Sequence, residues 1–239
     1  MIELHKIGGK YEVYQRNEFI GTLETYSNPH HLTNCYIKLN LIRLDSSISM
    51  ELFTRLRAVV GKPIQAMLDS TEISQIEFLT AAGFTCKRKC YEVEATAHDF
   101  ISDNGDMRIS ECIVGDLEYE ECCRMVYRHY AETHQSVNPL TSDFASFIMG
   151  LPKKVIYTRQ GNQIMKVAFV EDNEIAYVCG ADEAYFAHFA RSLVSFMLSE
   201  HETIFFEADD CDWVAMMLRG LFKNLDDESY DTYILGDIL

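Results

Sequence analysis

The sequence predicts an α/β protein with a mixed sheet, because apolar strands alternate with amphipathic helices and this order occurs twice. Each occurrence runs strand, helix, strand, helix, strand. The first comprises Tyr36–Leu44, Met50–Val60, Ile64–Leu68, Glu72–Ala82 and Phe84–Val93. The second comprises Glu174–Cys179, Ala184–Glu200, Thr203–Glu207, Trp213–Phe222 and Tyr230–Leu235. Two related domains account for such a repeat.

A β-hairpin is expected before the first repeat. Two runs rich in aromatic and β-branched residues, Tyr11–Arg16 and Phe19–Tyr26, flank a turn at Asn17 and Glu18. A loop over Ser27–Thr33 then leads into the first strand of the repeat.

The two helices of the first repeat each carry apolar residues at helical spacing. The first helix ends at Gly61, and Gly83 follows the second as a cap. The residues expected to be buried are Leu52, Phe53, Leu56, Val59 and Val60 in the first helix and Ile73, Ile76 and Leu79 in the second.

The second repeat is preceded by further elements. They are a strand at Arg108–Val114, helices at Asp116–Thr133 and Ser142–Met149, and strands at Lys154–Thr158 and Ile164–Val170. Gln160, Gly161 and Asn162 form the turn between these last two strands. In the helix Ala184–Glu200, a stripe of Phe186, Phe189, Leu193 and Phe196 predicts core packing.

Charge divides the chain unevenly. Residues 1–95 hold 11 Lys and Arg and 11 Asp and Glu, whereas residues 96–239 hold 10 and 26, so the formal charge of −16 belongs to the second part. The polar segment Thr96–Met107 marks the boundary, which gives domains at 1–95 and 108–239 joined by a linker at 96–107. An acidic surface repels nucleic acid and attracts a cationic amine, although it also serves solubility alone.

Location and metal content follow from apolar runs and cysteines. No run approaches the roughly 20 apolar residues of a membrane span, and Met1–Lys10 lacks the apolar core of a signal peptide, so we expect a cytoplasmic protein without a membrane partner. The eight cysteines are mostly in apolar segments and show no Cys-x-x-Cys spacing. Reduced thiols and no metal site are therefore expected.

Two short sequence motifs carry a family resemblance. Ile76–Phe84, IEFLTAAGF, resembles the fourth helix and Gly-Phe end of the GNAT (GCN5-related N-acetyltransferase) family, and Asp212–Leu218 is its counterpart in the second repeat. The order of elements over residues 108–239 is similar to the whole acyl-CoA N-acyltransferase fold. Residues 11–95 resemble the same fold without its two leading helices. The resemblance implies two tandem copies, the first truncated and structural.

The resemblance also implies acetyl-CoA as co-substrate, bound where the fourth and fifth strands separate. A backbone amide near Val178–Gly180 would hold the oxyanion, and the turn Ala181–Ala190 would hold the pyrophosphate. The cofactor-binding residues expected on this basis are Val178, Gly180, Ala181, Ala187, Ala190 and Asp212. In the family's Gln/Arg-x-x-Gly-x-Gly/Ala signature only Ala190 agrees, and Asp182 and Glu183 add negative charge nearby.

Candidate catalytic residues follow from strand ends and helix faces. Glu207, at the end of a strand, is the expected base. Arg219 and Leu79 stand where the family often has a tyrosine, so Tyr230 or Tyr233 near the last strand would replace that acid, and Tyr233 is the expected one. Alternatively, Asp210 or Asp212 caps the following helix beside Glu207. On the acceptor side we expect His129, Tyr130 and His134, although a helical histidine is commonly a partly buried structural residue.

Phosphate-binding loops, dinucleotide-binding glycine motifs, nucleophile elbows and zinc-protease motifs do not occur in the sequence, which disfavours kinases, dehydrogenases and hydrolases. The favoured function is transfer of an acetyl group from acetyl-CoA to a small, cationic amine by direct attack on the thioester. The rival is an inactive member of the same fold that serves binding or dimerisation, and a homodimer is compatible with either function.

Overall fold

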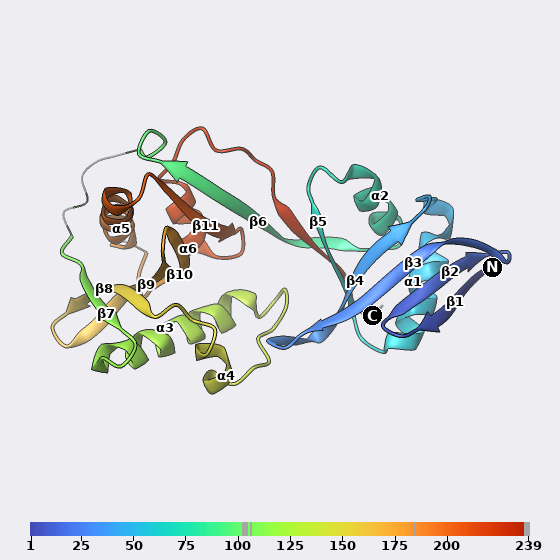
Figure 1. Cartoon of the computed structure of the whole chain (residues 1–239), viewed down its shortest axis with the longest axis horizontal. Coiled ribbons are helices and arrows are strands. Elements are labelled where there is room, and N and C mark those ends of the chain that lie inside the picture. The colour runs from blue at the N-terminus through green and yellow to red at the C-terminus, as the bar shows by residue number, and fades with distance from the viewer. Residues whose placement is uncertain (102–104, 106, 184, 237–239) are drawn as a thin grey trace. The chain divides into compact units, whose positions relative to one another are not determined.

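The computed structural model describes residues 1–239 except 102–104, 106, 184 and 237–239. The chain forms two compact units (Figure 1). The first unit comprises Met1–Lys89, Ser136–Thr141 and Glu228–Leu239, and the second comprises Cys90–Gln135 and Ser142–Asp227. The limits of these two units are set by the contacts between residues. The expected domains at 1–95 and 108–239 were defined by the two copies of the repeat, and they stay a prediction.

In the described part of the first unit, the strands follow the order β1-β2-β3-β4-β5-β12-β6 across the sheet, and two helices accompany them. Its strands are β1 (Ile2–Ile7), β2 (Lys10–Gln15), β3 (Glu18–Asn28), β4 (His31–Leu41), β5 (Ile64–Asp69), β12 (Tyr230–Leu235) and the beginning of β6 (Thr85–Thr96). Its helices are α1 (Ser46–Val60) and α2 (Ile73–Ala81). β4 and β5 are parallel, and β12 pairs antiparallel with β5 along its whole length. The last strand of the chain is thus part of the first unit.

Apolar side chains from α1 and α2 pack with those of the strands in one core. Leu52, Phe53 and Leu56 are buried as expected, and so is Leu79. Ile73 and Val59 are exposed, so their predicted burial is wrong. The prediction failed because α2 begins at Ile73 and Val59 lies in the last turn of α1, where fewer neighbours surround a side chain.

Two predictions near the amino terminus need correction. The loop expected at Ser27–Thr33 is wrong, because β3 extends to Asn28 and β4 begins at His31, and a tight turn joins them. The predicted hairpin is confirmed, but its turn is at Arg16 and Asn17, both with positive φ, which suits the twist of a two-residue turn. β1 was missed, although Ile2 and Leu4 alternate with Glu3 and His5 as in a half-buried strand.

The second unit has the strand order β6-β11-β10-β9-β8-β7. These strands are β7 (Ser110–Ile113), β8 (Lys154–Gln160), β9 (Gln163–Glu171), β10 (Glu174–Gly180), β11 (Thr203–Asp209) and the end of β6. The helices are α3 (Leu117–His134), α4 (Phe144–Ile148), α5 (Phe186–Glu200) and α6 (Trp213–Arg219). Neighbouring strands are antiparallel except β10 and β11, which are parallel.

The core of the second unit confirms the apolar stripe of α5. Phe186, Phe189 and Leu193 are fully buried, and Phe196 packs partly buried against the same cluster. α6 supplies Val214 and Leu218 to this core. In the part of the chain that the structure describes, the helices are too short or too polar to traverse a lipid bilayer.

Candidate functional site

The parallel strands of the second unit separate soon after they meet. β10 and β11 share a single pair, Glu174 with Phe205, although β10 runs on to Gly180 and β11 to Asp209. β10 also has a register shift against β9 between Ile175 and Tyr177. A bulge of this kind strengthens the local twist and re-aims the backbone, which favours separation of the two strands. Backbone amides of β10 beyond the bulge are thereby placed next to the start of α5.

A buried lysine lies beside the amino-terminal end of α5. Lys166 of β9 is opposite Gly180 in the sheet and is only 4% exposed. Its Nζ lies 3.8 Å from Asp182 Oδ2 and 5.9 Å from the centre of the Tyr185 ring. Asp182 Oδ1 in turn accepts a hydrogen bond from the Tyr185 amide at 3.1 Å. A cation and helix amides therefore converge here, with a carboxylate between them.

Close packing explains the glycine at the end of β10. A Cβ atom at Gly180 would lie 2.7 Å from Cδ2 of Phe186, so a side chain there would displace a fully buried ring. Phe186 also makes an edge contact with Trp213, 5.5 Å between ring centres. Among the expected cofactor residues of this region, Ala190 is fully buried, Val178 and Ala187 are partly buried, and Ala181 is exposed.

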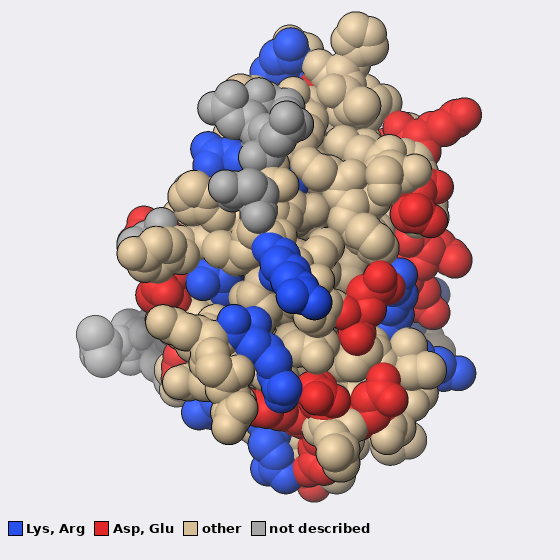
Figure 2. Space-filling view, turned by 90° about the vertical axis from the view of Figure 1, so that its left-hand side faces the viewer, with Lys and Arg blue, Asp and Glu red and all other residues tan. Residues whose placement is uncertain are grey.

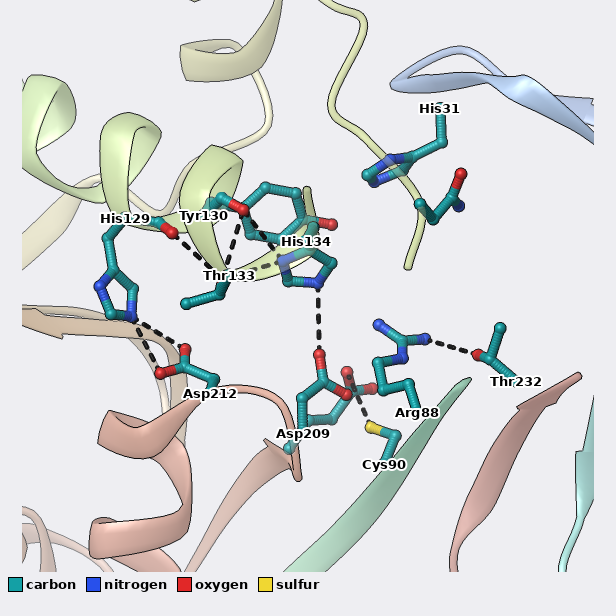
Figure 3. A network of polar contacts seen from close by, with 12 residues as sticks. His31, Arg88, Cys90, His129, Tyr130, Thr133, His134, Asp209, Asp212 and Thr232 are labelled. Atoms are coloured by element: carbon teal, nitrogen blue, oxygen red, sulfur yellow. Dashed lines mark hydrogen bonds and ion pairs between the residues drawn. The ribbon is translucent and has the colours of Figure 1, made fainter. Parts of the chain in front are cut away.

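His129 of α3 reaches Asp212 at the start of α6 (Figure 3). Its Nε2 lies 3.0 Å from both carboxylate oxygens, and Asp212 Oδ1 also accepts the Val214 amide at 2.9 Å. The alternative that Asp212 is the helix N-cap is therefore confirmed. Burial first, and then the charge of Asp212, raise the pKa of the neighbouring Cys179 thiol to about 12. Cys179 is accordingly a neutral thiol near neutral pH.

His134 forms a second link from α3, to Asp209 at the end of β11 (Figure 3). The ring nitrogen Nε2 is 3.3 Å from Asp209 Oδ2, and Nδ1 is 3.0 Å from the Tyr130 carbonyl oxygen. The His134 ring stacks on Tyr130 with 3.9 Å between ring centres and is 4% exposed. Burial of these side chains confirms the alternative that the helical histidines are partly buried residues. The contact between His134 and Asp209 joins α3 to the end of β11.

Glu207 is exposed on β11, and Cys90 Sγ donates to its Oε2 at 3.8 Å. Tyr177 of β10 is close enough to be influenced by that carboxylate. Its pKa is raised mainly by burial and then by the charges of Glu207 and Glu174. A carboxylate and a protonated phenol therefore lie in the same region, near the bulge in β10.

Tyr233 is placed elsewhere. It is on β12, opposite Ala66 of β5, and it is buried in the core of the first unit, where burial raises its pKa. Glu207 belongs to the second unit. The two residues expected to act as base and acid thus belong to different units, because the last strand pairs with β5.

Sequence reasoning missed Lys166 and Tyr177. Each is a polar residue in an otherwise apolar strand, within IMKVAFV and EIAYVC. That interruption was the available signal, since a buried charge is costly and is retained where it has a partner or a task.

Among the residues that the structure describes, no three or more His, Cys, Asp and Glu side chains form a group suited to a metal ion. Each of the eight cysteines, all of which the structure describes, is a thiol outside any disulfide bond. On the face that Figure 2 presents, Asp and Glu side chains gather along the right-hand edge, whereas several Lys and Arg side chains lie nearer the middle. Acidic composition therefore coexists with local basic surface.

No family model and no curated protein matches the sequence. Solved structures do match. A GCN5-related N-acetyltransferase from Sphaerobacter thermophilus is 9% identical, with 97% of this chain and 82% of that chain covered and a TM-score of 0.58. An acetyltransferase of the GNAT family from Colwellia psychrerythraea is 9% identical, with 95% and 85% covered and a TM-score of 0.51. The chain has the GNAT fold, and the predicted fold is confirmed.

Proposed function

We propose that the chain is an N-acetyltransferase of the GNAT family, which transfers an acetyl group from acetyl-CoA to a small cationic amine in the cytoplasm. The second unit would hold the reaction. The observation that carries this proposal is the buried Lys166 at the start of α5, beside the place where β10 and β11 separate. A lysine and helix amides at one point favour a phosphate group.

A lysine and a small number of backbone amides would hold acetyl-CoA, the acetyl donor. Lys166 and the amides at the start of α5 fit the pyrophosphate, and Asp182 is the counter-ion that the phosphates would displace. A backbone amide of β10 near Val178–Gly180 is suited to the developing oxyanion, because a fixed dipole there needs no reorganisation. Acetyl-CoA supplies an activated thioester that an amine can attack directly.

The acceptor side needs a base and a way to gather cations. Glu207, an exposed carboxylate beside the bulge, would accept the proton of the substrate ammonium, and Tyr177, a neutral phenol, would donate one to the leaving thiolate. His129 and His134 would hold α3 in place through Asp212 and Asp209. The second unit has 10 Lys and Arg against 25 Asp and Glu, which attracts a cationic substrate.

Replacing Lys166 by Met is expected to weaken acetyl-CoA binding by roughly 10- to 100-fold, because a charge-assisted hydrogen bond contributes about 1.5–3 kcal/mol. Calorimetric titration of the full chain with acetyl-CoA and with CoA measures this. Lys154→Met is the matched control, since Lys154 is also a sheet lysine but pairs with Glu111 and lies over the Phe196 ring, in the later part of α5 and not at its start. Equal binding by both variants would exclude Lys166 from the donor site, and failure of the folded wild-type chain to bind either ligand would refute the proposal.

Replacing Glu207 by Gln is expected to lower kcat for acetyl transfer by about 10²–10⁴-fold, as loss of a general base does. Release of the CoA thiol, followed across a panel of small amines, measures the rate. Glu202→Gln, an exposed glutamate just before β11, should retain full activity. A Glu207→Gln variant with wild-type kcat would show that another group removes the proton.

An inactive binding module is the second candidate, and one observation favours it. Asp182 already accepts the Tyr185 amide, and Phe186 is fully buried against Gly180, so the chain's own groups occupy part of the start of α5. Should the wild-type chain bind no CoA while remaining folded, this second function would replace the first.

A further inference from the structure

A pocket of 430 Å³ lies in the second unit, beside the second half of β6. Its other walls come from Phe205 of β11, from Arg219 of α6 and from the segment 224–226 that follows α6. The volume is within the range of small-molecule sites, which is roughly 300–1,000 Å³. The pocket is therefore large enough for a small organic ligand.

The pocket adjoins Glu207, the base proposed for the acceptor side. β6 and β11 are antiparallel, with Glu92 directly opposite Glu207 and Glu94 directly opposite Phe205. Opposed residues of neighbouring strands, and alternate residues of one strand, lie on the same face of a sheet. Glu92, Glu94 and Phe205 line the pocket. The pocket therefore continues from the proposed base along one face of the sheet.

Carboxylates outnumber cations in the lining. Among the described residues of the pocket, the charged side chains are one guanidinium and four carboxylates, from Arg219, Glu92, Glu94, Asp99 and Asp226. The second unit as a whole has 10 Lys and Arg against 25 Asp and Glu, so the potential at its surface attracts cations. Both the pocket and the unit around it thus favour a cationic ligand.

The guanidinium of Arg219 lies on the other side of β6. It is 4.1 Å from the centre of the Tyr91 ring, and alternation along the strand puts Tyr91 on the face opposite to Glu92 and Glu94. Arg219 Nη2 also donates to Asp227 Oδ1 at 3.3 Å. An aromatic ring and a carboxylate therefore hold this cation, and the face of β6 that carries the two glutamates is acidic.

Like charges lie opposite each other on this face. Glu92 and Glu207 are directly opposed on neighbouring strands, an arrangement that destabilises a sheet unless a cation is bound there. Among the residues that the structure describes, neither Glu92 nor Glu94 has an ion-pair partner. In the same part of the chain, they belong to no group of three or more side chains suited to a metal ion. An organic cation therefore fits this face better than a metal ion does.

We propose that the acceptor of the acetyl group is a short diamine, an inference that rests on the proposed function. One amine would lie at Glu207 and react, while the second, as an ammonium, would lie in the pocket at Glu92 and Glu94. Opposed side chains start about 5 Å apart and diagonal ones about 7–8 Å apart, so a chain of roughly three to five carbons joins the two amines.

The covalent step involves the first amine only. Its nitrogen forms a bond to the acetyl carbonyl carbon, and the C–S bond of the thioester breaks. Two protons leave that nitrogen, of which one goes to Glu207 and the other balances the proton that the CoA sulfur takes up. The second ammonium keeps its proton and its charge, so it contributes binding and orientation.

Diaminobutane with an amine on each end carbon, titrated calorimetrically into the full chain without acetyl-CoA, is the direct probe. We expect saturable one-to-one binding that is at least tenfold tighter than the binding of butylamine or aminobutanol, which lack the second charge. Added salt should weaken the binding of diaminobutane more than that of butylamine, because screening acts on each ion pair. No saturable binding, or equal affinity for diaminobutane and butylamine, would overturn the proposal.

Replacement of Glu94 by Gln tests the pocket itself. Glu94→Gln should weaken diaminobutane binding about tenfold more than butylamine binding, because only the diamine has an ammonium at that carboxylate. Glu202→Gln is the matched control, an exposed glutamate of the same unit outside the pocket. Glu94 is also exposed, so both variants should keep the wild-type thermal midpoint. Equal effects of the two variants on diamine binding would contradict the assignment of the pocket.

Kinetics separate this inference from the proposed function. With acetyl-CoA present, Glu94→Gln should raise KM for diaminobutane about tenfold and change kcat little, since the second ammonium does not react. Diamine binding that depends on Glu94 without any acetyl transfer would refute the proposed function and support the pocket. Acetyl transfer to butylamine and to diaminobutane with equal kcat/KM would refute the diamine and leave the proposed function standing.

Discussion

A chain that lacks residues 228–239 is expected to lose the fold of the first unit while the second unit stays folded. β12 pairs with β5 over six residues, and Tyr233 and Ile234 are buried in the first unit. Losing the strand pairing and these two buried side chains costs an amount comparable to the roughly 5–15 kcal/mol that stabilises a domain. Amide hydrogen exchange would show β1–β5 unprotected and β8–β11 protected.

A chain that ends at Gly236 is the matched control, because it retains all of β12. It should show wild-type protection in both units. A synthetic peptide of residues 228–236, added to the truncated chain, should restore protection in β5. Persistent protection of β5 without β12 or the peptide would contradict the assignment of the last strand to the first unit's core.

The second large effect concerns Phe186. Replacing this fully buried ring by Ala should destabilise the second unit by about 3–5 kcal/mol, because a large cavity would open next to Phe189 and Trp213. Urea unfolding at pH 7, with the slope of the transition checked against wild type, measures the change.

The Tyr185→Ala variant tests whether burial of the Phe186 ring is the cause of the destabilisation expected for Phe186→Ala. Tyr185 precedes Phe186 and is 63% exposed, so its loss should cost less than about 0.5 kcal/mol. Similar destabilisation by the two variants would mean that the start of α5 is not packed as described. Phe186→Leu should fall between them, since Leu fills part of the same volume.

The local pattern of apolar residues in the sequence predicted most of the helices and strands. The strand Tyr230–Leu235 was predicted with the bounds that β12 has, and the stripe on α5 that begins at Phe186 identified its buried face. These features depend on neighbours in the sequence, for which periodicity is a direct readout. The length of β3 and β4 was underestimated, because Pro29 and polar neighbours suggested a loop where a tight turn suffices.

The site was harder to predict, because it depends on long-range contacts. Glu207 and Tyr233 were both expected in the site of the second repeat, although the sequence alone does not place Tyr233 in space. β12 pairs with β5 instead, and no local signal encodes that choice. Likewise, Lys166 and Asp182 are brought together by the register of β9 against β10, which a single sequence does not reveal.

The position of β12 also has a consequence for the order of events during synthesis. Residues of the first unit leave the ribosome first, yet its sheet lacks an interior strand until Tyr230–Leu235 emerges. At roughly 5–20 residues per second, the wait between Lys89 and the end of β12 is about 7 to 30 seconds. The second unit, which needs only residues 90–135 and 142–227, has all its strands before the first does. The part of the polypeptide made earliest is thus expected to be completed last, and β5 needs protection from aggregation in the meantime.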